Sequence, residues 1–338
     1  MLKKPLECGR KTIVIKHFEG FPARMKEVKA ITERANFEYE ALSAIAASGL
    51  FDSDSTVQLP RPIDYDRETH TIFMHDLGSP IPLAQVLEKG FPNEEASKSS
   101  SITPSNSEEI CKLTSKIGRA LGDFMGRFHN WSASPEHVAL RAYFPQRPKI
   151  NRMIMSAHHY FITRSADRFK LRENWMDELI AKDQQEDLMD GNVPVMGDCS
   201  LQNVLVSPPS EGRDMRIYLL DLEGARMSCP EVDIGRLTAS AISFELLYYP
   251  SSDRPFIPAL HQAYRLHRTL DARRLGILTG MDLIGFGPVL PWAKGQDEEK
   301  LKRVVMKGLE LLKSSIKEDE ELIITNPVMR HLFSPRSR

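Results

Sequence analysis

The sequence predicts an α+β protein of two lobes: a small, strand-rich first lobe over residues 1–77 and a larger, mainly helical second lobe over residues 78–338. Two runs rich in β-branched residues, 11–16 and 71–74, indicate strands in the first lobe. In the second lobe, apolar residues recur at helical spacing over long stretches. The length of 338 residues also fits two units, at a prior of about 150 residues per domain.

The first lobe can be divided into elements by its punctuating residues. The strand over residues 11–16 follows a glycine, and we expect it to be the second strand of a hairpin. Residues 25–47 carry an apolar face at helical spacing, and a glycine two residues later ends the predicted helix. Residues 59–62 contain two prolines and are expected to turn toward the strand over 71–74.

Residues 92–109 differ in composition from both flanks. Serine and glutamate dominate this stretch, and apolar residues are almost absent. Such a segment cannot bury enough apolar surface to balance the entropy of ordering it. We therefore predict a disordered insertion within the second lobe, with an ordered surface loop as the alternative.

The helix predicted over residues 110–131 carries a row of small residues. Gly118, Gly122 and Gly126 recur every four positions and so share one face. Glycine permits another backbone to approach closely. We expect this face to pack tightly against a neighbouring element.

Charge and composition exclude several classes of protein. Lys and Arg number 45 against 46 Asp and Glu, a formal net charge of -1, so the basic excess typical of nucleic-acid or anionic-membrane binders is absent. No apolar window of about 18 residues predicts a membrane span. The four cysteines lie far apart without a C-x-x-C pair, and the start lacks the pattern of a signal peptide. These features favour a cytoplasmic protein with reduced thiols.

Polar residues follow short strands in the second lobe. Strands are predicted at 193–196, 203–206 and 217–220, with a proline-rich turn between the last two. Asp198 and Asn203 flank the loop after the first strand, and Asp221 ends the third. Phosphoryl transfer needs a carboxylate to receive the proton of the acceptor hydroxyl and hard oxygen ligands for a divalent metal. The order D-x4-N followed by D matches the catalytic and metal-binding loops of kinases.

The first lobe offers a matching pair. Lys16 ends a strand and Glu38 lies in the following helix, and kinases hold nucleotide phosphates with a strand lysine braced by a helix glutamate. The alternative is structural: an exposed lysine, a solvated glutamate, and aspartates that only shape turns. The ordered set favours the kinase interpretation.

Several segments together resemble the aminoglycoside phosphotransferase/choline kinase family of small-molecule kinases. Residues 196–203, Met-Gly-Asp-Cys-Ser-Leu-Gln-Asn, are similar to its loop H-G-D-x-x-x-x-N, and residues 220–225 to its D-x-E segment. Weaker similarity covers 37–42, 121–129 and 230–237. The resemblance implies a two-lobed protein-kinase-like fold, ATP and Mg²⁺ as cofactors, and a small-molecule hydroxyl acceptor.

The resemblance also implies a role for each matching residue. Asp198 would be the catalytic base, and Asn203 and Asp221 would bind Mg²⁺. Lys16, braced by Glu38 in preference to the nearby Glu40, would hold the nucleotide phosphates.

Two further roles complete the implied site. Backbone groups around Met74 and His75 would contact adenine. Asp233 would brace the catalytic loop.

Two departures from the family pattern leave alternatives open. Met196 replaces the usual histidine, and only 15 residues, with no Gly-rich loop, precede Lys16, so the first lobe is short at its start. A catalytically impaired kinase-fold protein acting as a binding module is therefore the second hypothesis. A metal-dependent hydrolase using Asp198, Asp221 and Glu223 is a third, but it leaves Lys16 and Glu38 without a role.

Overall fold

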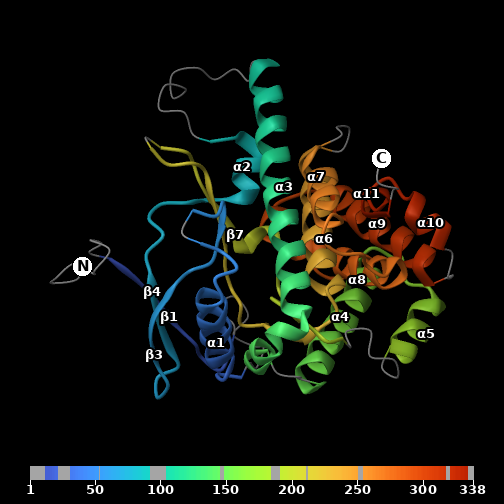
Figure 1. The fold of residues 1–338 in the computed structure, drawn as a ribbon. Coiled ribbons are helices and arrows are strands. Elements are labelled where there is room, and N and C mark those ends of the chain that lie inside the picture. The colour runs from blue at the N-terminus through green and yellow to red at the C-terminus, as the bar shows by residue number, and fades with distance from the viewer. Residues whose placement is uncertain are drawn as a thin grey trace.

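The structure is a computed structural model, and it describes residues 12–21, 31–52, 54–91, 104–144, 148–183, 191–210, 212–249, 254–316 and 320–333. Strands gather on one side of the long helix α3, and the helices from α6 to α11 lie on the other side (Figure 1). The predicted α+β class is confirmed. The strands are β1 Ile13–His17, β2 Val57–Gln58, β3 Pro62–Asp66, β4 Thr71–His75, β5 Ile81–Pro82, β6 Val193–Val195, β7 Val204–Ser207, β8 Arg216–Leu219 and β9 Arg226–Ser228.

The helices make up most of the second lobe. The α-helices are α1 Arg34–Ala47, α2 Leu83–Lys89, α3 Pro104–Ala133, α4 Pro148–Arg168, α5 Asn174–Asp183, α6 Glu231–Tyr248, α7 Phe256–Tyr264, α8 Ala272–Gly285, α9 Glu298–Ile316, α10 Glu320–Thr325 and α11 Arg330–Phe333. Short 3-10 helices cover Pro135–Tyr143, Leu201–Asn203, Gly287–Val289 and Pro291–Ala293. Within the described residues, none of the helices is both long and apolar enough to cross a membrane.

The sheet of the first lobe has the order β1-β4-β3, and both pairings are antiparallel. The predicted first strand therefore pairs with β4, placing Lys16 opposite Ile72, while its expected hairpin partner lies outside the described residues. Residue 62, predicted as part of a turn, instead begins β3. Proline is tolerated there because it is the first residue of an edge strand.

A second sheet connects the two predicted lobes. Its order is β2-β8-β7-β5, and β2 pairs in parallel with β8, with Val57 opposite Ile217. The hairpin predicted from the sequence, β7 with β8, forms its centre and is antiparallel. The boundary at residues 77 and 78 stays a prediction.

Two helix boundaries differ from the sequence prediction. Helix α1 starts at Arg34, and most of the earlier residues predicted to be helical, 25–30, lie outside the described part. Helix α3 starts at Pro104, so residues 104–109 are helical where disorder was predicted, whereas 92–103 lie outside the described part. Proline suits the first turn of a helix. A Glu108–Lys112 ion pair of 2.7 Å also supports the early turns of α3.

The glycine row of α3 packs against α7, as the sequence predicted. A Cβ atom at Gly122 would lie 2.1 Å from the backbone oxygen of Leu260, and one at Gly118 would lie 2.4 Å from that of Phe256. Only residues without side chains permit this approach. The contact fixes α3 against the helical part of the second lobe.

Candidate active site

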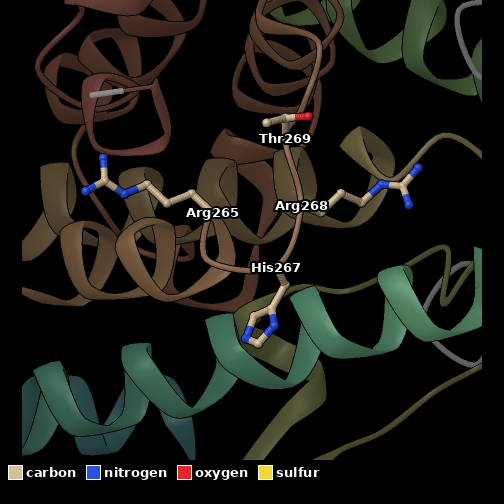
Figure 2. A pocket seen from close by; sticks show the side chains of 4 residues that line it. All are labelled: Arg265, His267, Arg268 and Thr269. Carbon is tan, nitrogen blue, oxygen red and sulfur yellow. The ribbon is translucent and has the colours of Figure 1, made fainter. Parts of the chain in front are cut away.

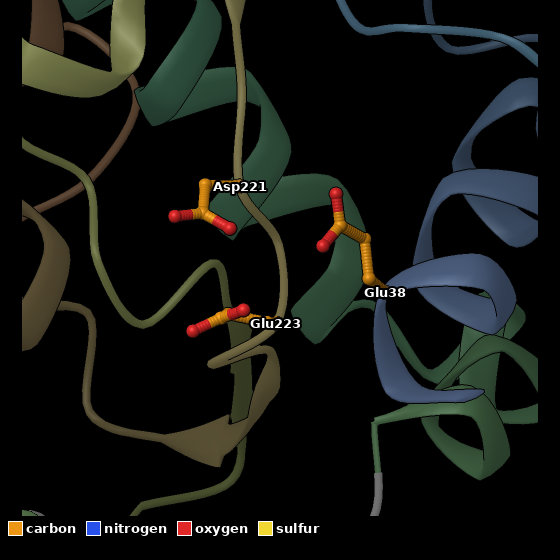
Figure 3. Close-up of side chains that lie close together, drawn as sticks. All are labelled: Glu38, Asp221 and Glu223. Atoms are coloured by element: carbon orange, nitrogen blue, oxygen red, sulfur yellow. The ribbon is translucent and has the colours of Figure 1, made fainter. Parts of the chain in front are cut away.

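Lys16 connects the two lobes through an ion-pair cluster of Lys16, Glu38 and Asp221. Its Nζ atom lies 2.5 Å from Glu38 Oε2 on α1 and 2.6 Å from Asp221 Oδ1 beyond β8. Figure 3 shows Glu38 pointing from α1 toward the loop that carries Asp221 and Glu223. Segments more than 200 positions apart in the sequence thus meet at one ammonium group. Glu40, the alternative brace, accepts a hydrogen bond from Asn36.

The register of one hairpin brings Asn203 beside Asp221. Val204 at the start of β7 lies opposite Leu219 at the end of β8. The ladder continues one step further, because the Leu220 N–H donates to the Asn203 carbonyl at 2.8 Å. Asn203 precedes one strand and Asp221 follows the other, so both lie at the same end of the hairpin.

Asp221 adopts an uncommon backbone conformation. Its φ is 67°, in the left-handed region that few residues other than glycine occupy. Aspartate and asparagine tolerate this region better than most residues, because their short polar side chains bond locally. This conformation lies between the end of β8 and the turn that begins at Glu223.

Asp198 is held through both carboxylate oxygens. Asn203 Nδ2 donates to Oδ2 at 3.1 Å and to the Asp198 backbone oxygen at 2.9 Å. Arg236 Nε donates to Oδ1 at 3.0 Å. Because the Asn203 amide nitrogen is used on Asp198, its side-chain oxygen is left as the group that can act as a ligand.

Asp233 holds the 196–203 loop by hydrogen bonds, which agrees with the role that the family resemblance implied. This side chain is 0% exposed and accepts hydrogen bonds from the Met196 and Gly197 backbone N–H groups, both at 2.8 Å. His129 Nε2 lies 3.1 Å from the same carboxylate. The loop is therefore supported by Asp233 although Met196 stands where the family pattern has histidine. The Met196 side chain itself lies in the hydrophobic core.

Gly197 cannot carry a side chain in this loop. Its φ is 88°, and a Cβ atom would lie 2.2 Å from the Gly224 carbonyl oxygen. The buried Arg226 donates to that same oxygen at 2.8 Å. The close approach of residues 197 and 224 sets the distance between the two polar loops.

A second ion pair between the lobes was not predicted from the sequence. Arg34 Nη1 lies 2.8 and 2.9 Å from the two carboxylate oxygens of Glu223, and Nη2 donates to the Glu19 and Phe21 backbone oxygens. The available signal was its spacing: Arg34 precedes Glu38 by one helical turn and so shares its face. Arg236 was missed as well, although it follows Asp233 by three positions.

Burial and charge act against each other in the ion-pair cluster. Burial alone would lower the pKa of Lys16, but the carboxylates of Glu38 and Asp221 outweigh it and raise that pKa. Burial raises the pKa of Glu38 to about 7, and Lys16 only partly offsets this effect. Burial also raises the pKa of Glu223, with Asp221 adding to the effect. The lysine therefore stays charged, whereas Glu38 titrates near neutral pH.

Glu38 makes the stability of the protein depend on pH. Its pKa rises from the ordinary 4.5 to about 7 on folding, so its contribution is complete below pH 4.5 and is lost as the pH rises through 7. This difference corresponds to about 3 kcal/mol. The free energy of unfolding, measured with urea, should therefore fall as the pH rises from about 5 to about 8. We expect this fall to be larger in the parent than in Glu38→Gln, which has no titrating group at this position.

Glu40→Gln is the matched control, because Glu40 lies on the same helix and bonds Asn36. It should follow the parent across the same pH range. An equal fall in Glu38→Gln and the parent would contradict the assignment.

The donor set near Asp221 fits a hard divalent cation. Carboxylate oxygens of Glu38, Asp221 and Glu223 all lie within 4.8 Å of one another. Glu38 is paired with Lys16 and Glu223 with Arg34, whereas Asp221 uses Oδ1 on Lys16 and has a second oxygen. Carboxylate and amide oxygens suit Mg²⁺. Asp221 is therefore the member of this cluster with an oxygen left for a metal, and the metal site formed by Asn203 and Asp221 stays a prediction.

Met74 and His75 lie at the end of β4, where the sequence predicted adenine contacts. Met74 pairs with Val14 on one side and Pro62 on the other, and the His75 N–H donates to the Arg61 carbonyl at 3.0 Å. That N–H is therefore already used within the sheet. The adenine contact of this segment stays a prediction.

A hollow of about 380 Å³ lies elsewhere, lined by Arg265, His267, Arg268 and Thr269. Figure 2 shows the two guanidinium groups pointing away from each other and His267 turned toward α3. His267 pairs there with Asp123 at 2.8 Å. The cationic groups do not converge, so this hollow is not the candidate active site.

Comparison with known proteins establishes the class. Residues 30–275 match the model of the phosphotransferase enzyme family, and the chain belongs to this family. The family predicted from the loop motifs is thereby confirmed.

Individual relatives are more distant. A 4-hydroxytryptamine kinase of Psilocybe cyanescens is 21% identical over 332 residues, covering 95% of this chain and 85% of that protein. A second, of Psilocybe cubensis, is 22% identical over 232 residues, covering 67% and 59%. Among solved structures, an aminoglycoside 2'-phosphotransferase-IIIa variant with GDP has a TM-score of 0.46 at 15% identity, covering 87% of this chain and 85% of that one. A choline kinase of Cryptosporidium parvum has a TM-score of 0.46 at 12% identity, covering 95% and 86%.

Proposed function

We propose that this protein transfers the γ-phosphoryl group of ATP, together with Mg²⁺, to a hydroxyl group of a small molecule. The main support is the ion-pair cluster of Lys16, Glu38 and Asp221, which joins a strand lysine, a helix glutamate and a loop aspartate from distant parts of the chain. Asp198 and Asn203 adjoin it through the β7–β8 hairpin. Membership of the phosphotransferase enzyme family supports the reaction class.

Each residue has a defined task in this reaction. The acceptor hydroxyl donates a hydrogen bond to the Asp198 carboxylate, and the hydroxyl oxygen attacks the γ-phosphorus. A P–O bond forms to the acceptor, the bond to the β,γ-bridging oxygen breaks, and ADP leaves with that electron pair. The hydroxyl proton passes to the Asp198 carboxylate, and Lys16 holds the phosphate oxygens. Asn203 and Asp221 would hold Mg²⁺, which would supply positive charge against the phosphates.

The geometry disfavours a metal-dependent hydrolase. Such a site needs several carboxylates free to bind metal. Of the three acidic residues that such a site would use, Glu223 is paired with Arg34, and both oxygens of Asp198 are bonded by Arg236 and Asn203. Asp221 alone would then be the carboxylate ligand, which suits a metal that is held partly by nucleotide phosphates.

The relatives suggest the first acceptor to try. Both are named 4-hydroxytryptamine kinases, and 4-hydroxytryptamine carries a hydroxyl group on an aromatic ring together with a primary amine. We propose that the acceptor is an aromatic or aliphatic hydroxyl compound that also carries an amine or a quaternary ammonium group. Ethanolamine and choline are the aliphatic members to compare.

Transfer of labelled phosphate from ATP tests the proposal. With Mg²⁺ and 4-hydroxytryptamine, ethanolamine or choline, we expect an acceptor phosphate to form. Lys16→Met removes the cation that holds the phosphates and should lower kcat/KM for ATP about 100-fold.

Lys89→Met, at a 69% exposed side chain, is the control and should keep the parent rate. A parent protein that neither binds ATP nor transfers phosphate would contradict the proposal. That outcome would favour the binding-module alternative.

A further inference from the structure

Side chains on one face of α6 form hydrogen bonds along the 196–203 loop. Asp233, Arg236 and Ser240 follow one another at spacings of three and four residues, so their side chains project from the same face. Asp233 accepts the backbone N–H groups of residues 196 and 197, and Ser240 Oγ accepts the Leu201 N–H at 3.1 Å. Arg236, between them, is the member of this row that bonds the side chain of Asp198.

Arg236 is itself anchored at its far end. Its Nη1 donates to Asp282 Oδ1 on α8 at 3.0 Å, and His158 Nε2 of α4 lies 2.7 Å from that same oxygen. The guanidinium carbon lies 4.2 Å from the centre of the Phe286 ring, which His158 contacts edge-on. Three helices and an aromatic ring thus fix a side chain that is 13% exposed.

The charges in this chain of contacts are matched. Burial disfavours the charge of Arg236, but Asp282 and Asp198 outweigh it and raise the pKa of the guanidinium further. Burial raises the pKa of Asp282, yet Arg236 and His158 outweigh burial and the value ends below the ordinary one. The guanidinium group of Arg236 is therefore shared between the carboxylates of Asp282 and Asp198.

The two contacts of Asp198 leave room for an acceptor. Arg236 takes one oxygen and Asn203 the other, whereas an ionised carboxylate offers about four lone-pair sites. Both contacts come from planar groups, which fix the plane of the carboxylate as well as its position.

We propose that Arg236 is a positioning residue, anchored by Asp282, that sets the orientation of the Asp198 carboxylate toward the acceptor hydroxyl. This inference rests on the proposed function, because Asp198 must be the base for its orientation to matter. A misplacement of about 1 Å at a reacting group can cost about 100-fold in rate. Removing Arg236 should therefore reduce kcat and leave nucleotide binding intact.

Arg236→Gln is the main variant, and steady-state transfer to 4-hydroxytryptamine and to water is the measurement. We expect kcat to fall about 10-fold to about 100-fold, with KM for ATP changed less than about 3-fold. Arg236→Lys keeps the charge but cannot reach both carboxylates at once, so its kcat should lie between the parent and Arg236→Gln. Arg303→Gln, at an exposed position on α9, is the control and should match the parent.

A double-mutant cycle separates positioning from a merely structural role. In an Asp198→Asn background, Arg236→Gln should cause almost no further loss of kcat, because it acts through Asp198. An equal loss in both backgrounds would overturn the inference, and so would an unchanged kcat in Arg236→Gln. If Arg236→Gln does not fold, Arg236→Lys decides in the same cycle by the same criteria. A parent that transfers phosphate to neither acceptor nor water would overturn the proposed function first, and this inference with it.

Discussion

Asp198→Asn is expected to bind ATP and Mg²⁺ like the parent but to transfer phosphate at least about 100-fold more slowly. A positioned base typically contributes about 10² to about 10⁴ in rate. Asparagine keeps the shape of the side chain and one oxygen for Arg236, but it cannot take the hydroxyl proton. Single-turnover transfer under saturating ATP measures the chemical step directly.

The control for this variant comes from the neighbouring hairpin. Asp214→Asn makes the same change at an exposed residue of the β7–β8 connection and should keep the parent rate. Equal rates in Asp198→Asn and the parent would exclude Asp198 as the base.

Asp233→Ala should cause the largest loss of stability. Two backbone N–H groups of the loop and His129 Nε2 would lose their common acceptor inside the core. A carboxylate only accepts, so His129 donates from Nε2, and its Nδ1 lies 3.0 Å from the Tyr264 hydroxyl. Each buried donor without a partner costs about 1–3 kcal/mol, which gives a total of about 4 kcal/mol.

Denaturant and thermal unfolding of Asp233→Ala measure this loss. Asp54→Ala removes an aspartate with a 92% exposed side chain that pairs with Arg216, and it should change stability by less than about 1 kcal/mol. Comparable small effects in both variants would mean that the loop does not depend on Asp233. In the proposed function the 196–203 loop carries the base. Asp233→Ala should therefore also lose phosphate transfer at temperatures at which it is still folded.

The polar loops of the second lobe could be predicted from the sequence, because the residue patterns that specify them are local. A proline-rich turn between two β-branched runs specifies a hairpin, and its antiparallel register alone brings Asn203 beside Asp221. The hairpin needs only a few neighbouring residues to be recognised. The role of Asp233 came from the family resemblance instead, because its partners, the Met196 and Gly197 backbone N–H groups, belong to a distant loop.

The pairings between distant segments were not accessible in this way. Nothing near Val57 specifies a parallel pairing with Ile217, because parallel neighbours are chosen by the packing of the whole domain. The partners of Arg34 and Arg236 were also missed. Long arginine side chains reach several candidate carboxylates, so only the assembled fold selects Glu223 for one and Asp198 with Asp282 for the other.

The proposed function requires Lys16, Glu38 and Asp221 to form a nucleotide site that depends on a divalent metal. The experiment is calorimetric titration of ATP, with and without Mg²⁺, into the parent and into Asp221→Asn. Asparagine tolerates the left-handed backbone of this position, so the variant should fold. We predict Mg²⁺-dependent binding to the parent and loss of the Mg²⁺ dependence in Asp221→Asn. Binding that is absent from the parent, or equally Mg²⁺-dependent in both proteins, would contradict the account.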